Sequence, residues 1–228
     1  MKCRISKKEF LERLRAVLKI WDEPILRFGK EGLNIVEVDP AHIMMINTTI
    51  PAQDWEIYDI DNRDFAINLE LFVNVLKKLR DPFIELNIDD IGITINDKIR
   101  INEIEANKEK KKIPKLTYDF EFSIERDKLK ELIDTSALYT DNLKFLVEED
   151  KVYAISENDI IQMREEIGKV KLLTDAKGKG AYSIDYLQNA IVMKGDVVNI
   201  WFGVDKPIKI EYADKNTYYL IAPRITEE

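Results

Sequence analysis

The side chains that could perform nucleophilic or metal chemistry are scarce in this sequence of 228 residues. One histidine, His42, and one cysteine, Cys3, cannot build a four-ligand Cys/His zinc site. The segment Lys177–Gly180 alternates lysine and glycine, but it lacks the spacing of a phosphate-binding loop and is typical of a flexible turn. No serine elbow or His-Glu-x-x-His motif occurs. We therefore expect no cofactor, no metal and no catalytic residue of these kinds.

Carboxylates are the one potentially catalytic group in good supply, with 43 Asp and Glu residues. Adjacent pairs such as Asp89-Asp90 fall at expected turns, where solvation is their ordinary role. Two carboxylates from distant segments can still converge in space and act as a general acid and base. An enzyme that uses surface carboxylates on a duplicated α+β scaffold therefore stays open as an alternative function, although no spacing favours it.

Basic side chains gather in the stretches 7–20 and 70–80, although the whole chain has a net charge of −8. In the first stretch Lys8, Arg15 and Lys19 share one stripe, opposite an apolar stripe at helical spacing. A basic face on an acidic protein can bind phosphates while the remaining surface repels nucleic acid. An ordinary solvated helix face is the alternative explanation of the same charges.

The elements that must position these groups are four amphipathic helices, expected at about residues 7–20, 70–80, 125–138 and 183–194. Ser6 is the expected N-cap of the first helix, and Glu9 is placed to complete a capping box. The apolar positions expected to face the core in the second helix are Leu71, Phe72, Val75 and Leu79.

Short apolar segments bounded by turn signals predict strands between the helices. The expected strands include residues 33–38, 43–50, 83–88, 92–95, 99–104, 152–155, 197–202, 208–212 and 218–221.

The second half of the sequence repeats the apolar pattern of the first. Ile25–Ile50 aligns over Asn142–Ile167 without a gap, and Phe28 then lies over Phe145. We therefore expect an α+β fold of two similar domains, each a largely antiparallel sheet with two helices on one face. The expected bounds are 1–107 for the first domain, 108–118 for an interdomain linker and 119–228 for the second domain.

The junction between the halves, Asn107–Tyr118, is rich in lysine. A solvated linker is the ordinary explanation of such a charge run. Ile113-Pro114 and Leu116 within it are harder to explain, because apolar side chains on a linker need a surface to pack against.

The location of the protein follows from composition. No run approaches 18 apolar residues, and residues 1–10 are too charged for a signal peptide. The single cysteine agrees with a reducing compartment. We expect a cytoplasmic protein with no membrane partner.

Several separated segments resemble the PCNA-type DNA sliding clamps of archaea and eukaryotes, in the order in which that family has them. The resemblance is carried by Gly32-Leu33-Asn34 with Val38–Ile43, by Ala66–Leu69, by Tyr182–Leu187, by Pro207–Tyr212 and by Tyr218–Ile225. The last segment, Tyr-Tyr-Leu-Ile-Ala-Pro-Arg-Ile, differs from the family's ending by one inserted residue. The resemblance spans essentially the whole chain.

The resemblance implies the DNA clamp fold and a non-catalytic function. Three subunits would form a ring around duplex DNA, without reading its sequence, and act as a polymerase processivity factor. Partners would be DNA polymerase, flap endonuclease and DNA ligase, with a clamp loader that opens the ring. A monomeric peptide-binding adaptor is a weaker alternative.

The resemblance also implies three sets of site residues. The expected DNA-facing residues are Arg13, Arg15, Lys19 and Lys77. The expected groove for partner peptides comprises Val38, His42, Ile43, Met45, Ile113, Pro207, Ala222, Pro223 and Ile225. The expected subunit interface uses Ile99 and Ile101 in an edge strand at 97–104, with Ile161 and Met163 in another at 159–167.

Some of these residues have simpler explanations. Val38, Ile43 and Met45 could each belong to the core of a strand, and His42 could be a structural turn residue. The third helix departs from the family pattern because Asp127 and Glu131 replace basic side chains on its outer face, together with Asp134. The fourth helix has Asp185 where a basic residue is common. Homotrimer and heterotrimer with paralogous subunits both stay open.

Overall fold

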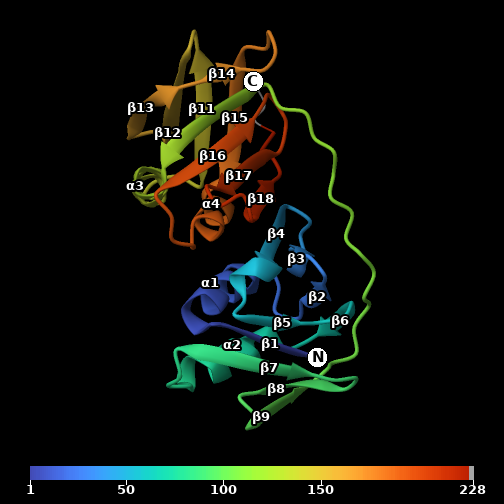
Figure 1. Ribbon diagram of the computed structural model, residues 1–228. Helices are drawn as coiled ribbons and strands as arrows, with labels where there is room; N and C mark the ends of the chain where they lie inside the picture. The colour runs from blue at the N-terminus through green and yellow to red at the C-terminus, as the bar shows by residue number, and fades with distance from the viewer. Residues whose placement is uncertain (226–228) are drawn as a thin grey trace. The chain divides into compact units, whose positions relative to one another are not determined.

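The computed structural model describes residues 1–225 and forms two compact units, Met1–Lys112 and Ile113–Glu228. The boundary between the units falls inside the expected linker. Each unit is a mixture of helices and antiparallel strands (Figure 1). The expected α+β class is therefore confirmed.

The first unit begins with a strand and has one helix in each half. Its elements are β1 (Lys2–Ser6), α1 (Lys7–Leu18), β2 (Ile25–Gly29), β3 (Gly32–Val38), β4 (Met44–Pro51), η1 (Ala52–Asp54), β5 (Ile57–Asp59), β6 (Arg63–Ala66), α2 (Leu69–Lys78), β7 (Phe83–Ile88), β8 (Gly92–Ile95) and β9 (Ile99–Asn102).

The second unit repeats this order of strands and helices, apart from the short η1. Its elements are β10 (Phe120–Glu125), α3 (Arg126–Ser136), β11 (Asn142–Glu148), β12 (Lys151–Glu157), β13 (Gln162–Lys169), β14 (Lys171–Leu172), β15 (Gly178–Ser183), α4 (Ile184–Ala190), β16 (Val197–Phe202), β17 (Ile208–Tyr212) and β18 (Thr217–Ile221).

The strand order is the same in both units. In the first unit the orders are β5-β1-β7-β8-β9 and β4-β3-β2-β6, and in the second they are β14-β10-β16-β17-β18 and β13-β12-β11-β15. Each unit thus divides its strands between two sheets, where the apolar pattern predicted one. In each unit the strand that precedes the first helix pairs with the strand that follows the second helix, as β1 pairs with β7 and β10 with β16. These pairs start a sheet separate from the one formed by most of the strands between the two helices.

The core of the first unit is built around aromatic rings brought together by both helices. The ring of Phe10 in α1 lies 5.7 Å from that of Trp55, which follows η1, and 5.9 Å from that of Phe72 in α2, measured between centroids. All three side chains are buried. Figure 1 shows α1 and α2 lying side by side in this unit.

The second unit has an aromatic core of its own. Phe145 lies 5.7 Å from Phe122 and 5.8 Å from Phe202, measured between ring centroids. The inner face of α3 packs into this core through Leu129, Leu132 and Ile133, as the sequence predicts.

The inward face of α2 was predicted wrongly. Leu71 is 55% exposed, and the buried face is formed by Leu69, Phe72, Val73 and Leu76. The Leu71 N–H donates to Asn68 Oδ1 at 2.8 Å, so Asn68 is the N-cap and the helix begins one residue earlier than expected. Leu69 then starts a buried stripe with i, i+3, i+4, i+7 spacing, which the expected bounds left incomplete.

Other helix ends also differ from expectation. Ser6 occupies the N-cap of α1, but its side chain makes no capping hydrogen bond, so the capping box does not form. The fourth helix ends at Ala190 instead of about Lys194, and the strand expected at 99–104 ends at Asn102. Ile191 is nevertheless buried, as its apolar spacing predicted.

Candidate functional site

The two helices of the first unit carry cations that the rest of the chain leaves available. Arg15, Lys19 and Lys77 are exposed, and none of them forms an ion pair with another residue in 1–225. Lys19 is the C-cap of α1 and Lys77 lies in the last turn of α2, where the helix dipole favours positive charge. Arg13 is half-buried on α1. The surface of α1 and α2 can therefore attract phosphate groups.

The basic side chains of α3 are instead neutralised within the chain. Lys128 Nζ lies 2.5 Å from Glu165 Oε1 and 3.5 Å from Glu131 Oε2. Lys130 pairs with Asp134 one turn further along the helix. The acidic outer face predicted for α3 is thus present, and its lysines are already partnered.

Asp39 organises the turn between β3 and β4, which contains the only histidine. Its carboxylate accepts hydrogen bonds from the backbone N–H groups of Ala41, Ile43 and Met44, at 3.1, 2.8 and 2.6 Å. His42 is exposed and has a φ of 56°, a left-handed conformation that such a carboxylate can stabilise. The sequence predicts a turn at Asp39-Pro40, and the structure adds that the Asp39 carboxylate itself holds that turn.

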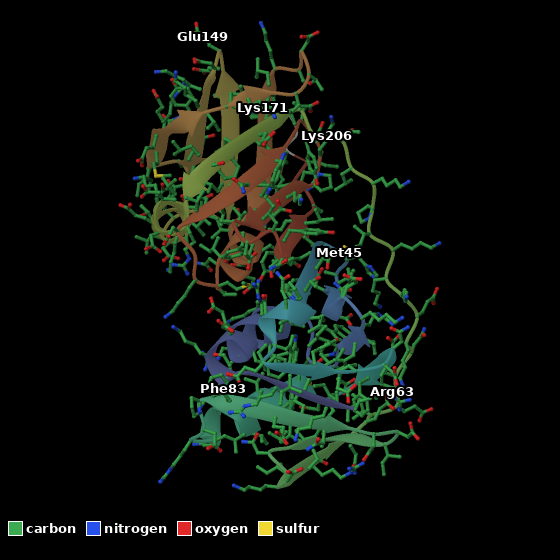
Figure 2. All side chains as sticks on the ribbon, viewed as in Figure 1. Met45, Arg63, Phe83, Glu149, Lys171 and Lys206 are labelled. Atoms are coloured by element: carbon green, nitrogen blue, oxygen red, sulfur yellow. The ribbon has the colours of Figure 1, made fainter. Side chains whose placement is uncertain are left out.

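Three of the expected groove residues lie on one face of the β3–β4 pair. Val38 is the register partner of Met45, and both are half-buried, as is Ile43. Their neighbours Met44 and Ile46 are buried. The alternation shows that these three side chains lie on the face away from the core, so they are not ordinary core residues. Figure 2 labels Met45 on β4.

The remaining groove residues belong to the second unit. Pro207, Ala222 and Pro223 are half-buried, whereas Ile113 and Ile225 are 44% and 83% exposed. The chain at this end is held by the Arg224 N–H, which donates to Ala181 O at 2.8 Å. The two sets lie in separate units, and the groove as a whole stays a prediction.

Arg27 fixes the start of the linker. Its Nη2 donates to the carbonyl oxygens of Lys108 and Glu109, both at 3.0 Å, while its Nη1 pairs with Asp64. Arg27 lies in β2, far from the linker in sequence, so no local spacing could have revealed this contact. The hydrogen bonds set the position of the linker's first residues against the first unit.

Glu37 is a buried carboxylate beside the same region. It is 3% exposed, and its Oε1 accepts a hydrogen bond from the Ile25 N–H at 2.9 Å. Burial raises the pKa of Glu37, although the Ile25 N–H and the charges of Lys111 and Arg27 act to lower it. The folded state therefore holds a proton on Glu37 more strongly than the unfolded chain does.

We expect Glu37→Gln to be more stable than the parent chain at neutral pH. Below the unfolded pKa both states are protonated, so Glu37 costs nothing; as pH rises toward the raised folded pKa, ionisation favours unfolding by about 1.4 kcal/mol per unit of pKa difference. Glutamine keeps the oxygen that accepts from Ile25 and cannot ionise. Urea unfolding from about pH 4 to pH 8 measures the effect.

The control for this variant is Glu31→Gln, because Glu31 is exposed. Its stability should follow the parent chain at every pH. Equal stability of Glu37→Gln and the parent across the whole range would contradict the expectation.

The residues expected at a subunit interface lie in or beside edge strands. In their sheet orders β9 and β13 each have a neighbour on one side. Ile161 immediately precedes β13 and is 45% exposed, while Met163 and Ile99 are half-buried. Ile101 is 7% exposed, so its side chain belongs to the core of the first unit and only its backbone faces the edge.

Within residues 1–225 no group of three or more His, Cys, Asp or Glu side chains is arranged to hold a metal ion. No helix in the same residues is long and apolar enough to cross a membrane.

Curated relatives extend over nearly the whole chain. The DNA polymerase sliding clamp of Thermococcus sibiricus is 24% identical over 242 residues, and DNA polymerase sliding clamp 1 of Thermococcus kodakarensis is 26% identical over 239 residues. Each alignment covers 96% of both proteins. This chain is a homologue of the PCNA-type DNA sliding clamps. No protein-family model matches it.

Solved PCNA structures share the fold. PCNA from Thermococcus kodakaraensis superposes with a TM-score of 0.88 at 22% identity, covering 98% of this chain and 99% of that one. A. fulgidus PCNA bound to the C-terminal region of FEN-1 gives a TM-score of 0.87 at 20% identity, covering 100% and 99%. The duplicated order of elements is thus the sliding-clamp fold.

Proposed function

We propose that this chain is a subunit of a ring-shaped DNA sliding clamp that encircles duplex DNA in the cytoplasm. The observation that carries the proposal is the sequence match over nearly the whole chain to proteins named DNA polymerase sliding clamp, together with the fold shared with solved PCNA structures. The exposed cations of α1 and α2 support it, since they offer phosphate contacts on a chain of net charge −8. Such contacts are loose and sequence-independent, which permits sliding.

Ring closure would use the free edges of β9 and β13. An edge strand presents unpaired backbone groups, so β9 of one subunit can add to β13 of the next. A head-to-tail contact of this kind closes into a ring when the rotation between successive subunits brings the last subunit back to the first. Ile160 and Ile161, which are 90% and 45% exposed, supply apolar surface beside the edge. A related structure from Sulfolobus tokodaii is a PCNA2–PCNA3 complex, so a heterotrimer is as admissible as a homotrimer.

The clamp would act as a docking platform and carry out no reaction itself. Val38, Ile43 and Met45 from the first unit, with Ala222 and Pro223 from the second, would receive a short peptide with apolar anchors. The expected partners are DNA polymerase, flap endonuclease, DNA ligase and the clamp loader. The A. fulgidus relative was solved with the C-terminal region of FEN-1 bound, which supports docking of a partner through one of its terminal segments.

Retention on circular DNA tests the proposal. Purified protein is loaded onto a closed circle, separated from free protein by gel filtration, and divided into a circular and a linearised sample. Topological binding predicts that protein stays on the closed circle and leaves once the DNA is cut. Equal retention on both forms at moderate salt would contradict an encircling ring.

A variant that cannot close provides the control. Ile160→Asp combined with Ile161→Asp places two charges beside the edge and should give a monomer by light scattering, with no retention on the circle. Val204→Asp is the matched change, since Val204 is exposed in the β16–β17 turn and away from both edges. It should assemble and be retained normally.

A further inference from the structure

The linker contains a lysine segment that forms no ion pair within the described residues 1–225. We call residues 110–117 the lysine strap; its cations are Lys110, Lys111, Lys112 and Lys115, all exposed. Just before the strap, Lys108 pairs with Glu103, and Arg27 holds the carbonyls of Lys108 and Glu109. From Lys110 to Thr117 the structure forms no hydrogen bond and no ion pair with another described residue. Figure 2 shows side chains projecting from this extended segment.

The charge of the strap is unusual for this chain. Acidic residues outnumber basic ones, and lysines on the sheets commonly lie beside a carboxylate, as Lys144 does with Glu157 at 2.7 Å and Lys151 with Glu166 at 2.8 Å. The strap instead places four lysines within the six residues 110–115. Their mutual repulsion falls when an anionic segment binds among them.

The strap begins beside the groove residues of the first unit. Strand β3 ends at Glu37 and Val38, and Glu37 Oε1 accepts a hydrogen bond at 2.9 Å from the Ile25 N–H in β2. Arg27, which holds the linker, lies in the neighbouring strand β2. A peptide seated on Val38 therefore has flanking residues within reach of the strap.

The strap also mixes apolar and basic side chains. Ile113, Pro114 and Leu116 are interleaved with the lysines. A phosphate backbone offers nothing apolar for these residues, whereas a peptide with apolar anchors and acidic neighbours matches both kinds. The available cations suited to DNA lie on α1 and α2, which are different elements.

We propose that the lysine strap selects docking peptides whose apolar anchors are flanked by aspartate or glutamate. This inference rests on the proposed partner groove and names the charge of the peptide that the groove accepts. The apolar anchors give every partner peptide a similar basal affinity. The strap then raises the affinity of peptides whose flanking residues are acidic above that of peptides whose flanking residues are neutral or basic. The preference is electrostatic, so it weakens as salt rises.

Three synthetic peptides with identical apolar anchors test the inference, with flanks of aspartate, glutamine or lysine. Binding to the assembled protein is followed by fluorescence anisotropy at low and high salt. We expect the acidic peptide to bind roughly tenfold more tightly than the neutral one at low salt, with the lysine peptide weakest, and the differences to vanish at about 1 M salt. In the variant with Lys110, Lys111, Lys112 and Lys115 changed to Gln, all three peptides should bind like the neutral one.

A matched variant changes four exposed lysines elsewhere, Lys30, Lys177, Lys179 and Lys215, to Gln, and should keep the full preference. Equal affinity for all three flanks in the parent protein would overturn the inference and leave the groove intact. Failure of every peptide to bind would instead reject the groove. A strap variant that binds peptides normally but has weaker affinity for duplex DNA would reassign the strap to DNA.

Discussion

Replacing Phe72 with alanine should lower the free energy of unfolding by about 3–5 kcal/mol. Phe72 is fully buried on α2, and its ring contacts that of Phe10 on α1. Removing it leaves a cavity between the helices and takes away an edge-to-face aromatic interaction. The surrounding core can fill such a cavity only in part. Urea denaturation followed by tryptophan fluorescence would measure the destabilisation, because Trp55 lies against Phe10.

The adjacent residue provides a stringent comparison. Leu71→Ala changes an exposed side chain on the same helix and should alter stability by no more than about 0.5 kcal/mol. The pair also tests the direction in which α2 faces, since the apolar pattern alone pointed both side chains inward. A large destabilisation by Leu71→Ala with a small one by Phe72→Ala would mean that α2 turns its Leu71 face, and not its Phe72 face, into the core.

Changing Arg15, Lys19 and Lys77 to glutamine should make DNA binding markedly less dependent on salt. Removing one interaction with a phosphate should reduce the slope of log K against log salt by about 0.9, because fewer counterions are released on binding. Every subunit of a ring carries the change, so the reductions in slope from the subunits that contact the duplex add together. Anisotropy of a short labelled duplex, titrated with protein between about 50 and 200 mM salt, measures the slope.

Lys128→Gln combined with Lys130→Gln is the comparison for these cations. Both lysines lie on a helix in the equivalent position of the second unit, but each is paired with a carboxylate of its own chain. Their removal should leave the salt slope nearly unchanged. Similar slopes for the two variants would mean that the ion pairs open on DNA and that both units bind phosphates.

Much of the fold could be predicted from apolar spacing. The strands Phe83–Ile88 and Val197–Phe202 match the prediction at both ends, because alternation and the bounding turns specify such segments locally. The direction of α2 was missed because the expected helix began at residue 70 and left out Leu69, the first residue of the buried stripe. Asn68 marks the start of the helix through one hydrogen bond from the Leu71 N–H.

The candidate site was predictable to a smaller extent. The exposed cations of α1 follow from helical spacing within a short segment. The contact between Arg27 and the linker could not be predicted, because it joins residues separated by more than half of the first unit. The pairing of Lys128 with Glu165 is equally non-local, and it decides that a lysine on the outer face of α3 is not available to a ligand.

The first unit is formed by one uninterrupted stretch of sequence, Met1–Lys112, and this affects how the protein folds during synthesis. The sheet β5-β1-β7-β8-β9 is complete in sequence once Asn102 has been synthesised, before any strand of the second unit leaves the ribosome. Two units with the same order of elements could otherwise exchange equivalent strands, a known failure of repeated domains. Translation from the N-terminus lets the first copy fold before its competitor exists.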